Sequence, residues 1–320
     1  MRVLLTGATG FVGRGLLERM SALVNLELVA ALRRPVSGLP ESVARLQVPG
    51  LEPDTDWRTV LEGIDAVIHS AARVHVMHDT SSDPLAEFRK VNVEGTLNLA
   101  RQAAAAGVRR FIFISSIKVN GEGTPAGVPY LADAQAAPVD PYGISKMEAE
   151  QGLRALATET GMEVVIIRPT LVYGPGVKAN FLNMMRWLHK GVPLPFGAIH
   201  NRRSLVALDN LVDLIVTCVD HPAAANQTFL VSDGEDLSTT ELLRRMATAL
   251  GKPARLLPVP SRLLETAAAL LGKQALSQRL CGSLQVDIGK TRELLDWTPP
   301  VSVDEALRKT AEHFLQHRAQ

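Results

Sequence analysis

The chain has 320 residues, of which 46% are hydrophobic, and a formal net charge of +1. This composition suits a globular protein with a real core, and it excludes a disordered chain or a broad basic surface for nucleic acid. No uncharged stretch reaches the roughly 18 residues that span a bilayer, and no signal peptide precedes the first apolar run. We therefore expect a cytoplasmic protein with no membrane partner. Two cysteines, Cys218 and Cys281, are too few for a disulfide framework.

The first half of the chain alternates short aliphatic runs with longer helical patterns. Near-continuous apolar strands separated by helices are typical of a parallel sheet that is covered on both faces. Gly107 and Gly161 follow two of the helices as C-caps, and Asp83 with Pro84 begins another. The sequence thus predicts an α/β fold, a Rossmann-like doubly wound parallel sheet. The predicted strands cover residues 2–6, 26–32, 64–69, 110–115 and 163–168, and the predicted helices cover 12–23, 83–106 and 142–160.

The pattern changes after Pro169, where prolines and glycines cluster and later helices are expected at about 239–250 and 262–271. This change predicts a smaller C-terminal domain over the carboxyl edge of the sheet, where such folds bind ligands. We divide the chain into a Rossmann domain, residues 1–173 with a returning segment of about 203–232, and a substrate-binding domain, residues 174–202 and 233–320.

A glycine-rich turn joins the first strand to the first helix. Gly7 permits the tight turn, Gly10 lets the backbone approach a pyrophosphate, and Gly13 lets helix and strand pack closely. Phe11 and Val12 open the helix, whose free N–H groups would hold the phosphate charge. This arrangement predicts a dinucleotide site.

The end of the second strand bears on the choice of dinucleotide. NAD enzymes place an acidic residue about 20 residues beyond the glycine turn, on the ribose 2′-hydroxyl. Arg33 and Arg34 stand there instead, and arginine suits a 2′-phosphate. NADP(H) is therefore favoured. The alternative is two solvated arginines at a strand end, with NAD(H) bound.

Tyr142 and Lys146 are spaced to lie one turn apart on one helix face. A free tyrosine has a pKa of about 10 and is a poor base at neutral pH. A neighbouring ammonium lowers that pKa. Ser115 and Ser116 end the preceding strand, where a serine can hydrogen-bond the same substrate oxygen. We expect Ser116 to be catalytic and Ser115 to pack behind it.

The histidines do not predict a metal site. His69, His75 and His78 lie near one another in sequence without a metal-ligand spacing, and His69 stands on an apolar strand. We expect His69 to be a hydrogen-bonded core residue.

Taken together, these segments resemble an extended short-chain dehydrogenase/reductase of the nucleotide-sugar epimerase/dehydratase group. The resemblance implies that Ser116, Tyr142 and Lys146 form the catalytic triad, with Lys146 also holding the nicotinamide ribose. The segments that carry the resemblance are residues 5–13, 67–72, 92–96, 111–116, 142–146, 168–175, 203–209 and 287–297.

The same resemblance implies ligand contacts elsewhere. Ala71 and Ala72 would line the cofactor, and Pro169 would lie near the nicotinamide. Asn180 and Arg203 would hold the nucleotide of the substrate, with the arginine on its diphosphate. In this group an asparagine at the position of Asn92 is more often structural than a substrate contact.

Two departures from the family pattern are informative. Asn120 stands where the family often has tyrosine, in Val119-Asn120-Gly121. Ile117-Lys118 occupies the place where 4,6-dehydratases carry an Asp-Glu pair for the elimination of water. The second departure argues against a dehydratase.

Two reactions fit these residues. The first is NADPH-dependent reduction of a nucleoside-diphospho-4-keto-6-deoxy sugar of the UDP-N-acetylhexosamine type, for surface polysaccharides. The alternative is NAD-dependent 4-epimerisation of UDP-glucose or UDP-N-acetylglucosamine. Arg33 and Arg34 favour the reductase, because they suit NADP(H). An epimerase recycles its bound NAD and gains nothing from selecting NADP. A non-catalytic redox sensor of the same fold would usually lose the tyrosine. A homodimer packed through the helices at 83–106 and 142–160 is expected.

Overall fold

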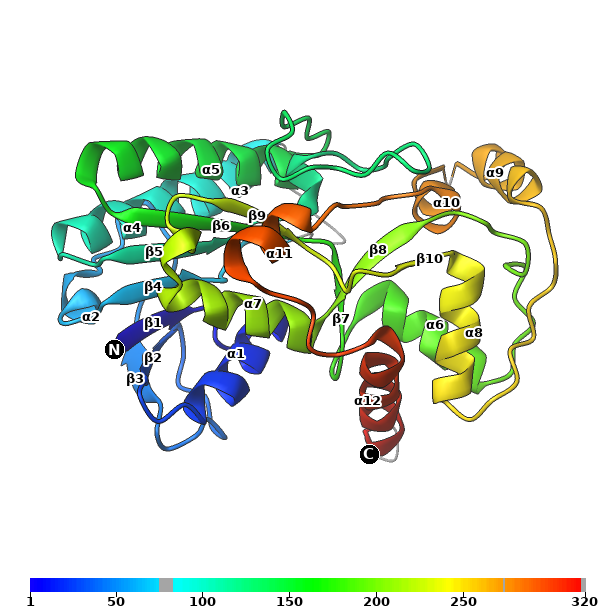
Figure 1. Ribbon diagram of the computed structural model, residues 1–320, viewed down its shortest axis with the longest axis horizontal. Helices are drawn as coiled ribbons and strands as arrows, with labels where there is room; N and C mark the ends of the chain where they lie inside the picture. Colours follow the sequence, from blue (N-terminus) through cyan, green and yellow to red (C-terminus); the bar gives the residue numbers. More distant parts are fainter. Residues whose placement is uncertain (75–82, 273, 318–320) are drawn as a thin grey trace.

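The structure, a computed structural model, describes residues 1–74, 83–272 and 274–317 (Figure 1). Its main element is a seven-stranded sheet in the order β3-β2-β1-β4-β5-β6-β9, and every pair of neighbours runs parallel. The predicted Rossmann-like parallel sheet is therefore confirmed. The strands are β1 (Arg2–Thr6), β2 (Glu27–Leu32), β3 (Ala44–Gln47), β4 (Ala66–His69), β5 (Arg110–Ile114), β6 (Glu163–Pro169) and β9 (Thr228–Val231).

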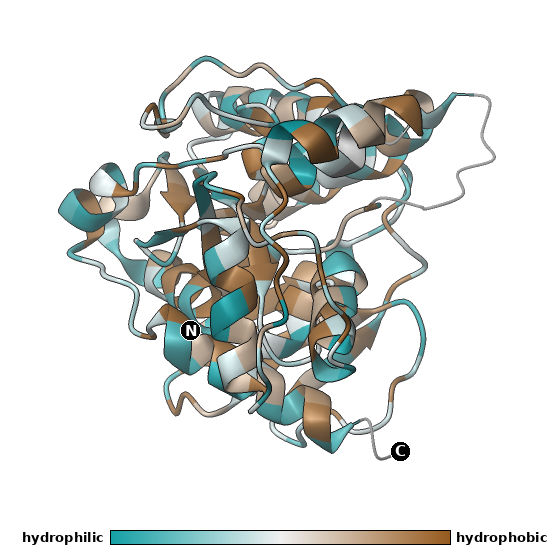
Figure 2. Ribbon diagram, turned by 90° about the vertical axis from the view of Figure 1, so that its right-hand side faces the viewer, coloured by the Kyte–Doolittle hydropathy of each residue, from teal (hydrophilic) through white to brown (hydrophobic). Residues whose placement is uncertain are grey.

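Helices cover both faces of this sheet, as its continuous apolar strands require. Successive side chains of β5 point to opposite faces: Phe111 and Phe113 join one core, whereas Ile112 and Ile114 join the other. Figure 2 shows the hydrophobic strands inside and hydrophilic residues outside. The first core includes α2 (Arg58–Leu61), α4 (Thr96–Ala105) and α5 (Pro141–Thr160), and the second includes α1 (Phe11–Ser21) and α7 (Leu208–Asp220).

A second lobe lies at the carboxyl edge of the large sheet (Figure 1). It contains a three-stranded sheet in the order β10-β8-β7 and a core of its own. No helix among the described residues is both long and apolar enough to cross a bilayer. The strands of this lobe are β7 (Leu171–Tyr173), β8 (Arg203–Ala207) and β10 (Asp236–Leu237), and its helices are α6 (Ala179–His189), α8 (Thr239–Ala249), α9 (Ser261–Leu270), α10 (Gln274–Cys281) and α12 (Val303–Gln316), while α11 (Gly289–Leu295) packs back against β9.

The predicted helix at 83–106 is not a single α-helix. It divides into α3 (Pro84–Arg89), a π-helical stretch η1 (Lys90–Gly95) and α4. Asn92 lies within this stretch, where its buried amide group accepts from the Arg73 N–H at 2.8 Å and donates to the Arg73 C=O at 3.0 Å and to Ser145 Oγ at 3.1 Å. Asn92 is thus structural, as the resemblance implied.

The remaining boundaries agree within two residues where elements were predicted. Asp83 accepts a hydrogen bond from the backbone of Ala86 as the predicted N-cap, and Gly161 ends α5 with a φ of 77°. The strand β3 was missed because its side chains alternate between partly buried and exposed at the sheet edge and include Arg45 and Gln47.

A buried hydrogen-bond cluster ties the two lobes together at α7. Asn210 is fully buried and donates to Asp233 Oδ1 at 2.7 Å and to the Val301 carbonyl at 2.8 Å. Its own oxygen accepts from the Val301 N–H at 2.9 Å. Asp233 also accepts from the hydroxyl of Tyr173 in β7, at 2.9 Å, so strand, helix and C-terminal segment converge here.

Replacing Asn210 with leucine should leave the backbone N–H and C=O groups of Val301 without their partner and remove one of the hydrogen bonds that Asp233 accepts. We expect Asn210→Leu to lower the free energy of unfolding by about 3 kcal/mol, measured by urea denaturation. Asn183→Leu is the control, since Asn183 makes one long contact of 3.4 Å on the surface of α6. Equal stability of the two variants would contradict the role of Asn210.

Candidate active site

The glycine turn after β1 is built for close backbone approach. A Cβ on Gly13 would lie 2.0 Å from the Gly7 carbonyl oxygen, so only glycine fits there. Gly7 has a φ of 74°, and a Cβ on it would lie 2.6 Å from the Ala71 backbone nitrogen. The turn therefore packs directly on the end of β4.

This turn leaves a helix end open for an anion. Gly10 is the exposed N-cap of α1, no side chain caps the helix, and its first turn contains no acidic residue. The free N–H groups and the helix dipole suit a pyrophosphate. The residues present thus fit a dinucleotide cofactor, with Phe11 and Val12 in the first helical turn beside it.

The other predicted cofactor residues stand at the same edge of the sheet. Ala71 and Ala72 follow β4, and Pro169 is the buried last residue of β6. Arg33 and Arg34 follow β2, which pairs with β1, and both are exposed. These placements are consistent with a dinucleotide lying across the strand ends, and the individual contacts remain predictions.

The structure brings the three predicted catalytic residues together. Asp140 caps α5 by accepting from the Gly143 N–H at 2.6 Å, which places Tyr142 in the first turn of the helix. Ser116 follows β5 and lies close enough to Tyr142 to lower the pKa of its hydroxyl. Lys146 lies one turn further along α5 and donates to the Ile114 carbonyl at 2.8 Å.

Neighbouring aromatic rings complete the surroundings of this pair. The ring of Phe88 from α3 contacts the Tyr142 ring edge-on at 6.0 Å between centroids. The Lys146 ammonium lies 4.3 Å from the centroid of the Phe113 ring. The side chains of Tyr142 and Lys146 are therefore oriented by α3 and by β5.

Burial has the largest effect on the pKa values of Tyr142 and Lys146. It raises the pKa of Tyr142 to about 12, and Asp140 raises it further, whereas the hydrogen bond from Ser116 lowers it. Burial also lowers the pKa of Lys146 to about 7, although the negative charge of Glu150 acts to raise it. The sequence predicts that Lys146 lowers the Tyr142 pKa, but in this structure the pKa is raised, because burial and Asp140 outweigh the effect of Ser116. A neutral phenol at neutral pH is suited to donating a proton.

His69 is a core residue, as predicted. Its ring nitrogens bond the hydroxyls of Thr6 at 2.7 Å and Thr96 at 3.0 Å, and burial lowers its pKa to about 3. His75 and His78 lie outside the described residues. Within residues 1–74, 83–272 and 274–317, no three His, Cys, Asp or Glu side chains are grouped to hold a metal ion.

The predicted substrate contacts lie in the second lobe. Asn180 is exposed in the first turn of α6, and Arg203 begins β8, where its Nη1 donates to the Gly282 carbonyl at 3.0 Å. Burial and the nearby charge of Arg279 both lower the pKa of Arg203. Two neighbouring guanidinium groups suit a diphosphate. Sequence reasoning missed Arg279, because only the packing of α10 brings it near Arg203.

The parallel sheet, the glycine turn and the Ser-Tyr-Lys group define a nicotinamide-dependent enzyme of the short-chain dehydrogenase/reductase type. The model of the NAD dependent epimerase/dehydratase family matches residues 3–232. The chain therefore belongs to this family of enzymes.

Individual relatives agree with this membership. The chain is 52% identical over 315 residues to the UDP-glucose 4-epimerase of Vibrio cholerae, covering 98% of this chain and 95% of that protein. Its fold is similar to that of the UDP-glucuronic acid 4-epimerase of Bacillus cereus in complex with NAD, with a TM-score of 0.80, 20% identity and 99% of each chain covered. It is also similar to the UDP-glucose 4-epimerase of Thermotoga maritima with UDP-glucose, with a TM-score of 0.78, 23% identity and 99% and 100% of the two chains covered.

The glycine turn gives a direct test of the cofactor site. We expect Gly13→Ala to abolish binding of nicotinamide dinucleotides, because its Cβ would push the Gly7 carbonyl into the turn. Binding is measured by quenching of tryptophan fluorescence. Gly50→Ala is the matched control, since a Cβ there meets its nearest atom at 3.9 Å. Retained binding in Gly13→Ala would contradict the predicted site.

The catalytic tyrosine gives a second test. We expect Tyr142→Phe to lower kcat by about 10²–10⁴-fold with little change in KM, because only the proton-transferring hydroxyl is removed. Tyr130→Phe should retain its activity, since the Tyr130 hydroxyl donates to the Gly123 carbonyl away from Tyr142. Steady-state kinetics on both variants decide the matter, and an active Tyr142→Phe enzyme would be incompatible with the assigned chemistry.

Proposed function

We propose that the chain is an NAD-dependent 4-epimerase of UDP-hexoses, which interconverts UDP-glucose and its C4 epimer. The observation that carries this proposal is the 52% identity to the Vibrio cholerae UDP-glucose 4-epimerase over 98% of the chain. The same extent of similarity supports a UDP-linked sugar as the substrate. This proposal reverses the order favoured by the sequence alone, in which the reductase came first.

The residues around Tyr142 account for the proton chemistry of such a reaction. Bound NAD supplies the acceptor and, after the sugar turns over, the donor of the hydride at C4. Tyr142 takes the proton of the 4-hydroxyl and returns it to the same oxygen, while Ser116 hydrogen-bonds that oxygen. The Lys146 ammonium stabilises the phenolate form of Tyr142, which takes the proton in the first transfer and forms again after the second, and between the two transfers Tyr142 is a neutral phenol.

Other parts of the chain would bind and orient the substrate. Arg203 and Arg279 would hold the diphosphate, and Asn180 would contact the nucleotide from α6. A homodimer packed through α3, α4 and α5, and the division into the two predicted domains, remain parts of this proposal.

A second candidate is the NADPH-dependent reductase of a UDP-4-keto-6-deoxy sugar. The exposed pair Arg33 and Arg34 at the end of β2 favours it, because this pair suits a 2′-phosphate and leaves the NAD ribose without a carboxylate. The Ser116, Tyr142 and Lys146 chemistry serves a one-way reduction equally well.

The nicotinamide that accompanies the purified protein separates these functions. The epimerase should release NAD on denaturation and convert UDP-galactose to UDP-glucose with no added nucleotide, as measured by chromatography of the sugar nucleotides. Conversion should be lost in Tyr142→Phe.

The opposite result is equally clear. A protein that converts neither UDP-galactose nor UDP-N-acetylgalactosamine, but oxidises added NADPH in the presence of a UDP-4-keto-6-deoxy sugar, would replace the epimerase with the reductase.

A further inference from the structure

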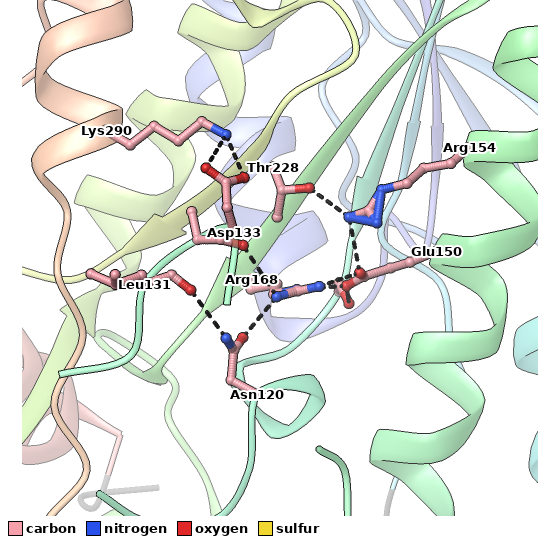
Figure 3. A network of polar contacts seen from close by, with 10 residues as sticks. Asn120, Leu131, Asp133, Glu150, Arg154, Arg168, Thr228 and Lys290 are labelled. Carbon is pink, nitrogen blue, oxygen red and sulfur yellow. Dashed lines mark hydrogen bonds and ion pairs between the residues drawn. The ribbon is translucent and has the colours of Figure 1, made fainter. Parts of the chain in front are cut away.

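Figure 3 shows a polar network that includes Glu150, Arg168 and Asn120, and this network extends to Ser115, the neighbour of Ser116. Its centre is Glu150 of α5, and its members come from the ends of β5 and β6 and from the segment after β5. One member is Asn120, which ends the short helical turn at residues 117–119 after β5.

Glu150 and Arg168 form a two-pronged ion pair. Arg168 Nε donates to Glu150 Oε1 at 2.9 Å, and Arg168 Nη2 donates to Oε2 at 2.6 Å. Glu150 is 1% exposed and Arg168 is 3% exposed. Enclosing two charges so completely costs desolvation free energy, and apolar residues of similar size would often be as stable. The pair therefore calls for an explanation beyond stability.

Ser115 and Asn120 fix this pair from two sides. The Ser115 hydroxyl donates to Glu150 Oε1 at 2.5 Å. Arg168 Nη1 donates to Asn120 Oδ1 at 2.9 Å, and the Asn120 amide donates to the Leu131 carbonyl at 3.2 Å. The buried carboxylate thus has one orientation, which the surrounding strands and loop determine.

Three members of the network adjoin residues of the candidate active site. Ser115 immediately precedes Ser116, and Arg168 immediately precedes Pro169. Glu150 follows Lys146 by one turn of α5, so both side chains lie on one helix face. Movement of Glu150 would therefore disturb both the end of β5 that bears Ser116 and the turn of α5 that bears Lys146.

We propose that Glu150, oriented by Arg168 and Asn120, is a positioning residue that fixes Ser116 through Ser115 and holds a negative charge beside the Lys146 ammonium. This inference rests on the catalytic roles given above to Ser116 and Lys146. It adds to them a carboxylate that contacts neither substrate nor cofactor.

The charged and titratable groups around Lys146 agree with this role. His69 faces it from β4 and is neutral, because burial holds its pKa at about 3. Tyr142 precedes it on α5, and Phe113 presents only a ring face from β5. Glu150 is the negative charge that raises the pKa of Lys146 against the effect of burial.

The variant Glu150→Gln tests the charge, because glutamine can still accept hydrogen bonds from Ser115 and Arg168. Lys146 should titrate about one pH unit lower in this variant. The titration is followed by NMR of protein labelled with ¹³Cε-lysine and saturated with NAD, with Lys146→Met used to assign the resonance. The alkaline limb of the kcat profile should move to lower pH by the same amount, which lowers kcat about fivefold at the midpoint of the wild-type limb and leaves KM nearly unchanged.

A double variant separates positioning from folding. Glu150→Gln alone leaves the Arg168 charge buried without its partner and could unfold the chain. Glu150→Gln with Arg168→Met removes both charges and should recover stability, yet the Lys146 titration should stay about one unit low. Ser115→Ala, which keeps both charges, should lower kcat a few-fold without moving the titration.

A matched control lies at the other end of the same two strands. Glu163 of β6 accepts from Arg110 Nε of β5 at 2.7 Å, and Arg110 is 1% exposed. Glu163→Gln removes the same charge from a pair in which the arginine is buried and the glutamate is 30% exposed, and it should lower stability without moving the titration of Lys146 or the alkaline limb.

Recovery of the wild-type Lys146 titration in the double variant would overturn the proposal and leave the pair a purely structural one. The NMR measurement needs no substrate. A failure to epimerise UDP-hexoses would therefore count against the proposed function, whereas an unchanged Lys146 resonance in Glu150→Gln would count against this inference.

Discussion

The parallel pairing of the strands is the constraint on which the rest of the structure depends. Because β1, β4, β5 and β6 run in one direction, their carboxyl ends must reach the same edge of the sheet. Gly7, Ala71 and Ser116 follow the first three of these ends, and Pro169 closes the fourth. Segments far apart in the sequence thus become neighbours through sheet geometry alone.

The apolar surroundings that stabilise this sheet also determine the chemistry at its edge. Burial favours the uncharged form of every group, so Lys146 and Tyr142 both resist ionisation where they stand. A site of this kind can hold an ammonium only if fixed negative or polar atoms face it. The Ile114 carbonyl and the Glu150 carboxylate meet that need from two different elements.

The sequence alone predicted the sheet, the glycine turn and the Ser-Tyr-Lys group, because each depends on local spacing and on residue types with few alternatives. Gly13 illustrates this, since no other side chain fits beside the Gly7 carbonyl. The partnership of Arg203 with Arg279 and the network around Glu150 could not be predicted, because their members lie far apart in the chain. Local spacing also could not predict β3, whose edge position lets polar residues alternate with apolar ones.

The π-helical stretch from Lys90 to Gly95 sets the angular relation between the helices on either side of it. A π-turn accommodates one residue more than an α-helical turn, so deleting one residue there would restore ordinary α-helical bonding. Such a deletion would rotate α3 by about 100° about the common axis relative to α4. Phe88 would then swing away from the ring of Tyr142. A change of length within these six residues would therefore alter the surroundings of Tyr142 directly.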